Sequence, residues 1–146
     1  MAVTISRYNH TAKLVMNKEL NYATLKVMLL NASASFTASN TTLAQVTNSG
    51  AYQVSGNGWT AGGLTIANAA VTVVATSGAM IDGDDVSATA TGGNIGPAFA
   101  AVIYDDSHGS DAPLWFIDFD GSQEAGDGTD FKVAFHSSGI ARVTSA

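Results

Sequence analysis

The chain contains no cysteine among its 146 residues and only two prolines. Without thiols it can form no disulfide, and it has no thiolate for zinc binding or redox chemistry. A chain of this length buries roughly two thirds of its unfolded surface, so it can fold without a covalent cross-link. We therefore expect a single domain over residues 1–146, with residues 1–10 as an extended N-terminal arm.

Charge is also scarce, because only 12% of the residues are charged, against about 25% in average proteins. The net charge of −6 argues against nucleic acid and acidic membranes as partners. Residues 1–81 hold four basic side chains and one acid, whereas residues 82–146 hold two basic side chains and eleven acids. The first segment thus has a net charge of +3 and the second a net charge of −9. Either these opposite charges orient subunits head to tail, or the acidic residues simply lie in solvated loops.

Long hydrophobic runs are missing as well. The longest uncharged apolar runs, such as residues 27–30 and 71–75, fall far below the ~18 residues of a membrane span. The first residues, Met-Ala-Val-Thr-Ile-Ser-Arg, are followed by no apolar stretch typical of a secretory signal. We expect a soluble chain that is made in the cytosol.

Small residues make up a large part of the amino-acid composition. Ala, Gly, Ser and Thr fill 68 of the 146 positions, while Leu, Ile, Val and Phe still total 33. That apolar share exceeds what disordered chains carry. The composition therefore indicates a folded domain with a weakly charged surface that suits close contact between subunits.

Short segments in which β-branched or aromatic residues alternate with others predict a series of strands. Turn residues separate these segments, and the spacing of roughly 8–12 residues is typical of an antiparallel β-sandwich or a jelly-roll-like barrel. A hairpin turn over residues 17–20 would join the first two strands. The predicted strands are residues 11–16, 23–30, 51–55, 64–66, 71–75, 86–91, 100–104, 114–119, 131–135 and 140–144.

One short helix is expected near residues 42–47. Thr42 and Gln45 fit a capping box, in which each side chain bonds the backbone at the other's position. Residues 48–50, Asn-Ser-Gly, would end it. The two prolines, Pro97 and Pro113, fall where strands are expected to begin. The fold class is thus all-β with one short helix.

Two acidic clusters, Asp82-Gly83-Asp84-Asp85 and Asp118-Phe119-Asp120-Gly121, have the spacing of calcium-binding loops. Neither is followed by the glutamate that an EF-hand needs at its twelfth position. Residues 126–130 resemble one calcium-binding nonapeptide, but that architecture requires stacked copies. We interpret these acids as solvated turn residues and predict no metal. Asp118 beside aromatic residues could also line a sugar groove, but a strand-end aspartate explains it better.

The residues offer no catalytic or cofactor site. The histidines His10, His108 and His136 are dispersed, and no nucleophile elbow is present. Residues 107–111 contain Ser, His and Asp, but neighbours in sequence rarely converge on one reacting atom. The glycines of residues 56–63 lack the strand–helix unit of a dinucleotide site. They are better explained as turn residues around Trp59, which we favour as a buried anchor over an exposed contact residue.

Eight segments, taken in chain order, form a pattern: YNHTAKL (8–14), KVMLL (26–30), TLAQV (42–46), GWTAGG (58–63), DDV (84–86), AVIYDD (101–106), FIDF (116–119) and GI (139–140). In this pattern the chain resembles a group of small virion structural proteins of tailed bacteriophages. The resemblance implies a non-enzymatic capsid decoration protein, without cofactor, that is assembled in the host cytoplasm. Its partners would be the major capsid protein, on the capsid exterior, and further copies of itself.

Such a role depends on contact area rather than on an active site. We expect the basic N-terminal residues to face an acidic partner surface or the acidic half of a neighbouring copy. One alternative is a tail or head–tail component, and another is a carbohydrate-binding adhesin module that uses Trp59, Trp115 and Tyr104. The candidate interface residues are Arg7, Tyr8, Lys13, Lys18, Lys26 and Trp59.

Overall fold

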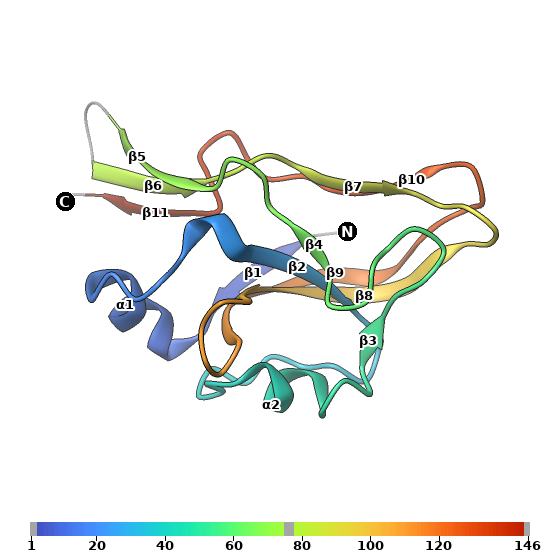
Figure 1. Ribbon diagram of the computed structural model, residues 1–146, viewed down its shortest axis with the longest axis horizontal. Coiled ribbons are helices and arrows are strands. Elements are labelled where there is room, and N and C mark those ends of the chain that lie inside the picture. Colours follow the sequence, from blue (N-terminus) through green and yellow to red (C-terminus); the bar gives the residue numbers. More distant parts are fainter. Residues whose placement is uncertain (1–2, 75–77, 145–146) are drawn as a thin grey trace.

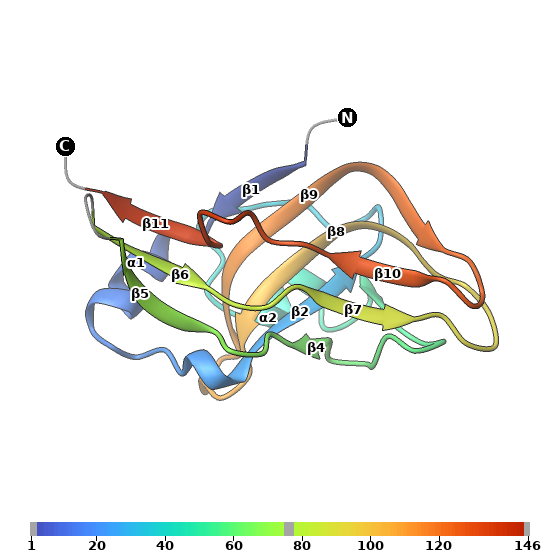
Figure 2. The same cartoon turned by 90° about the horizontal axis from the view of Figure 1, so that it is seen from above.

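The computed structural model describes residues 3–74 and 78–144, which form two layers of antiparallel strands (Figures 1 and 2). The main sheet has the order β1 (Thr4–Arg7), β9 (Ala112–Ala125), β8 (Ile95–Asp105), β2 (Leu25–Leu30) and β3 (Gln53–Val54), and β4 (Leu64–Thr65) also pairs with β2. Over it lie the sheet of β11 (Ala141–Thr144), β6 (Gly78–Asp82) and β5 (Ala70–Val74), and the ribbon of β10 (Asp130–Val133) and β7 (Val86–Thr89). The expected all-β sandwich is confirmed.

The central strands of the main sheet are buried on both faces. In β2, Val27 and Leu29 point into the core between the two layers, whereas Met28 and Leu30 enter a second core on the opposite face. Helix α2 (Leu43–Thr47) and the preceding segment cover that second face, and the helix contributes Val46 to this second core. Two buried faces explain why residues 27–30 of β2 are apolar without alternation, after the partly exposed Lys26.

The strand expected over residues 11–16 is wrong, because helix α1 (Asn9–Met16) occupies this segment. Thr11, Leu14 and Val15 contact the protein interior at the i, i+3, i+4 spacing of one helical face. The Thr11 hydroxyl also donates a hydrogen bond to the carbonyl of Leu114 at 2.8 Å. The hairpin at residues 17–20 is therefore wrong too, and a 3-10 turn, η1 (Tyr22–Thr24), leads into β2.

Residues 1–10 do not form a free arm over the part that is described. Residues 4–7 are extended, but they pair as edge strand β1 with β9, in the register Thr4 to Asp118 and Arg7 to Trp115. The helix α1 then begins at Asn9, whose backbone N–H donates to the carbonyl of Ala38 at 2.9 Å. The segment is thus built into the main sheet.

Strands β8 and β9 are longer than expected. Pro97 lies inside β8, where the register with β9 shifts, rather than before its start. Asp120 and Gly121, expected to end a strand, have φ of 56° and 136° inside β9. Turn-type residues here mark irregularities within long strands, which β-bulges accommodate. The strands β1 and β6 were not expected, and residue 75 of the expected strand 71–75 lies outside the described residues.

The capping box of α2 is confirmed. The hydroxyl of Thr42 accepts from the backbone N–H of Gln45 at 3.3 Å, and the Gln45 side chain accepts from the backbone N–H of Thr42 at 3.1 Å. Asn48, with φ of 48°, ends the helix in the left-handed conformation.

Gly63 allows the turn before β4 to approach β2. Its φ is +91°, and a Cβ at this position would lie 2.2 Å from the carbonyl oxygen of Val27. Only glycine tolerates both the backbone conformation and this contact. Gly50 has nearly the same φ, +92°, but no atom lies within 4 Å of the corresponding Cβ position.

We predict that Gly63→Ala lowers the free energy of unfolding by about 1–3 kcal/mol more than Gly50→Ala, the cost typical of overpacking. Both variants carry the same left-handed backbone strain, so their difference isolates the contact with Val27. Urea unfolding of the two variants measures it. Equal losses of stability would show that the backbones of residues 63 and 27 are not in contact.

Candidate functional site

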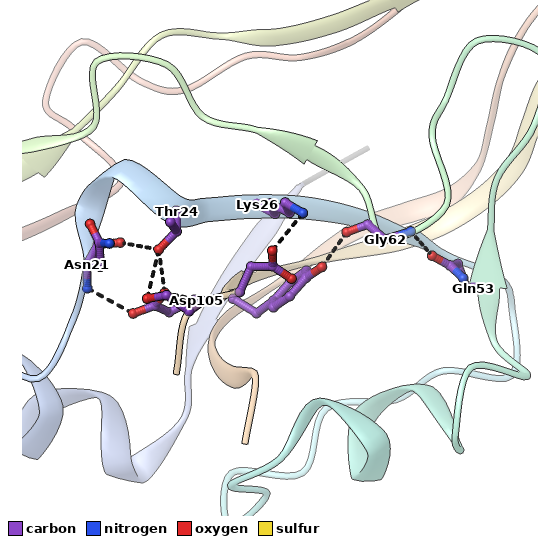
Figure 3. Close-up of polar contacts among 9 residues, drawn as sticks. Asn21, Thr24, Lys26, Gln53, Gly62 and Asp105 are labelled. Atoms are coloured by element: carbon purple, nitrogen blue, oxygen red, sulfur yellow. Dashed lines mark hydrogen bonds and ion pairs between the residues drawn. The ribbon is translucent and has the colours of Figure 1, made fainter. Parts of the chain in front are cut away.

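Asp105, at the end of β8, is the only charged residue that is buried in the described ranges. Its carboxylate accepts hydrogen bonds from the backbone N–H of Asn21 at 2.9 Å and from the hydroxyl of Thr24 at 2.7 Å (Figure 3). Ser107 donates two more, from its N–H at 3.0 Å and from its hydroxyl at 2.8 Å. The carboxylate is thus held by four donors of the same chain.

The register between β2 and β8 brings these groups together. Leu25 pairs with Asp105 and Lys26 pairs with Tyr104, so the turn that precedes β2 lies against the end of β8. Asn21 caps that turn by accepting the N–H of Ala23 at 3.1 Å. Segments about eighty residues apart in the chain are therefore fastened at one corner of the sheet.

The pKa of Asp105 has two opposing causes. Burial raises it, whereas the hydrogen bonds from Asn21, Thr24 and Ser107 lower it, and the net pKa lies below the ordinary value of 3.8. The side chain is ionised at neutral pH and its oxygens are occupied. Such a group is suited to holding structure rather than to transferring protons.

Two further contacts continue this polar line along the sheet (Figure 3). Lys26 pairs with Asp106 at 2.8 Å. The hydroxyl of Tyr104 donates to the carbonyl of Gly62, whose N–H donates to the side chain of Gln53. Burial, together with the charges of Asp106 and Asp111, raises the pKa of Tyr104 to about 12. Hydrogen bonds thus link β8 and β3 to the turn before β4.

The structure separates the candidate interface residues into three groups. Arg7, Lys13 and Lys18 are exposed, as a contact role requires. Lys26 is only partly exposed and is engaged by Asp106. Tyr8 and Trp59 have relative exposures of 0% and 1%, so proposing them as contact residues was wrong.

Packing explains the burial of these two rings. Tyr8 lies 5.0 Å from Phe36 between ring centroids, and Trp59 meets Phe131 edge-on at 5.5 Å. Within the described residues, the Tyr8 hydroxyl and the Trp59 Nε1–H have no hydrogen-bond partner. The interpretation of Trp59 as a buried anchor is therefore confirmed, whereas nothing in the sequence around Tyr8 indicated an interior position.

The aromatic residues expected for a carbohydrate-binding module are not available on the surface. Trp115 is 3% exposed and Tyr104 2% exposed, like Trp59 inside the domain. Sugar binding through stacking requires open ring faces. The adhesin module based on these three residues is therefore contradicted.

The turn acids have partners from their own surroundings. Asp84 accepts from the amide of Asn68 at 2.7 Å, and Asp85 pairs with Lys132 at 2.8 Å. The hydrogen bond from Lys132 and the backbone N–H of Phe135 lower the pKa of Asp85. No group of three or more His, Cys, Asp or Glu side chains that could hold a metal ion occurs in residues 3–74 and 78–144.

The histidines also make local contacts. A ring nitrogen of His10 lies 2.6 Å from the carbonyl oxygen of Pro113, and His136 accepts the N–H of Ser138 at 3.0 Å. His108 contacts the hydroxyl of Ser110 at 3.0 Å, two residues along the same loop. The Ser110 hydroxyl in turn donates to the carbonyl of Thr41 at 3.5 Å, which ties this loop to the segment before α2.

Open grooves among the described residues offer places where a partner could contact the domain, and two of them are described next. The first, called the β9–β10 groove here, has a volume of about 450 Å³, with Ile117, Phe119, Phe131, Glu124, Asp130 and Lys132 among its lining residues. The second, of about 310 Å³, lies between β1 and the segment of residues 32–36. It brings Asp118 beside Phe36 and Phe116.

Asp118 shares its face of β9 with Phe116, while Trp115, Ile117 and Phe119 point into the core between the layers. That alternation is as expected, but Asp118 does not end the strand. One of its oxygens accepts the N–H of Asp120 at 2.9 Å, where the strand is irregular.

None of the helices in the described ranges has the length and apolar character needed to cross a membrane. No family model matches the chain, and no curated protein or solved structure matches it either.

We predict that Asp105→Asn lowers the free energy of unfolding by about 2 kcal/mol, because an amide cannot accept from donors on both of its terminal atoms. Asp106→Asn, the neighbouring control, removes the charge that pairs with Lys26 at the partly exposed surface and should cost less than about 1 kcal/mol. Denaturant unfolding at neutral pH compares the two. Similar losses in the free energy of unfolding would show that the buried carboxylate of Asp105 stabilises the fold no more than the carboxylate of Asp106.

The acid dependence of stability provides a second measurement on the same variant. A depressed pKa in the folded state means that ionised Asp105 stabilises the fold above its ordinary pKa of 3.8. This contribution is lost as the pH falls through that value toward the folded pKa. The stability of Asp105→Asn should therefore fall less steeply with acid than that of the wild-type chain.

Proposed function

We propose that the chain is a non-enzymatic structural protein of a tailed-bacteriophage virion, most specifically a capsid decoration protein. It would bind the outer surface of the major capsid protein lattice as a homo-oligomer and reinforce the head. The sequence resemblance over eight ordered segments suggests this class. The observation that carries the non-enzymatic part is Asp105, a buried carboxylate whose four hydrogen bonds are all used within the chain.

The surface supports the same proposal. A decoration protein needs contact area and shape complementarity, and small side chains allow backbones of neighbouring subunits to approach closely. Few long charged side chains also means that little rotamer entropy is lost on docking. The exposed basic residues Arg7, Lys13 and Lys18 offer contacts to an acidic surface.

The copy number in the virion tests the proposal. For a decoration protein, quantitative mass spectrometry of purified virions whose genome encodes this chain should find it in amounts comparable with the major capsid protein. A copy number near that of a single vertex or tail ring would instead place it in the tail or at the head–tail junction. Its absence from purified virions would overturn the virion role altogether.

A further inference from the structure

An apolar sheet face extends beyond the core at one end of the domain. Val73, Ala79 and Val143 are paired across β5, β6 and β11, so their side chains share one face. Two residues along β6, Ile81 on that same face is buried in the core. Val73 and Val143, by contrast, are 80% and 72% exposed. We call this uncovered continuation, formed by Val73, Ala79 and Val143, the apolar overhang.

Among the described residues, the same end of the molecule carries the basic side chains that form no ion pair. Arg7 ends β1, Lys13 lies on α1 and Lys18 follows it, whereas Arg142 lies on β11 opposite Met80, on the other face of the sheet from the overhang. Across the described residues, the two ion pairs engage Lys26 and Lys132 instead. Figures 1 and 2 place α1 and β11 together at one end of the long axis. Apolar and basic character therefore coincide there.

The opposite end has the complementary character. Figure 1 places β7, β10 and the turn between β9 and β10 at the far end of the long axis. The β9–β10 groove opens beside them, with Phe119 and Phe131 among its apolar residues and the carboxylates Glu124 and Asp130 among its polar ones. Asp127 adds a third acid in the adjoining turn. Lys132, which also lines the groove, is engaged by Asp85.

We propose that copies of this chain associate head to tail, with the apolar overhang of one copy seated on the β9–β10 groove of the next. Lys13 of α1 and Lys18, which follows it, would then face Glu124, Asp127 and Asp130 of the neighbour. A second copy is the occupant that both surfaces fit, because each has the opposite charge of the other and both are partly apolar. An interface between unlike surfaces builds rings or filaments rather than twofold dimers.

This inference deepens the homo-oligomer of the proposed function and rests on it in that respect, but the purified chain tests it without a capsid. In sedimentation velocity, the average mass of the wild-type chain should rise with protein concentration. The rise should be weaker at high salt, because exposed charges are then screened. A chain that stays monomeric at every concentration would overturn the inference.

Two charge-reversal variants identify the surfaces. Lys13→Glu with Lys18→Glu makes both ends acidic, and Glu124→Lys with Asp127→Lys makes both ends basic. Each variant alone should associate at least about tenfold more weakly, because like charges now face each other. An equal mixture of the two should regain association, since each supplies an end that fits the other. The head-to-tail arrangement is contradicted if both variants associate as strongly as the wild-type chain. It is also contradicted if mixing the two variants does not restore association.

A third variant tests the apolar contact without changing any charge, so its result does not depend on whether the charge-reversal variants fold. Val73→Thr with Val143→Thr keeps β-branched residues in exposed strands but removes the apolar contact, and it should weaken association. Thr72→Ser, on the opposite face of β5, is the matched control and should leave association unchanged. Circular dichroism confirms that each variant is folded. If Val73→Thr/Val143→Thr associates as strongly as the control, the overhang is not part of the interface.

The outcomes separate the two proposals. A monomeric chain that is abundant in virions would leave capsid decoration standing and end this inference. Head-to-tail association of a chain that purified virions lack would support the surfaces assigned here and end the virion role.

Discussion

Burial of the central sheet on both faces is the constraint on which the rest of the structure depends. Strands β2, β8 and β9 must be covered from two sides, so the chain supplies one layer of strands and, opposite it, a helix with an irregular segment. The second layer is longer than the core beneath it, and its excess length becomes the apolar overhang. The exposed apolar surface of the overhang is thus a consequence of the unequal lengths of the two layers.

Polar groups at the sheet corner limit what the domain can do chemically. Asp105 is surrounded by donors of its own chain, and Tyr104 and Lys26 are likewise engaged by neighbours. Buried polar groups whose hydrogen bonds are satisfied stabilise one arrangement of the strands at this corner. Exposed basic residues such as Lys13 and Lys18 lie at one end of the described domain, and the acids of the β9–β10 groove lie at the other.

Local signals in the sequence predicted most strands, the capping box of α2 and the anchor role of Trp59, because each depends on neighbours in the chain. The segment 11–16 was assigned to the wrong structure although Thr11, Leu14 and Val15 carried a helical spacing, since β-branched residues there also suggested a strand. The Asp105 cluster could not be foreseen, because its donors at Asn21 and Thr24 become neighbours only through long-range pairing. The burial of Tyr8 has the same cause.

The order of strands in the main sheet also has a consequence for how the chain comes to be folded during synthesis. Strand β1 pairs with β9, and β2 pairs along one edge with β3 and β4 and along the other with β8, so β1 and one edge of β2 find their partners only among residues 95–125. A ribosome must therefore release most of the chain before the central ladder can close. Pairing across such sequence distances is slow, and the edge of the early apolar strand β2 that faces β8 remains unpaired in the meantime.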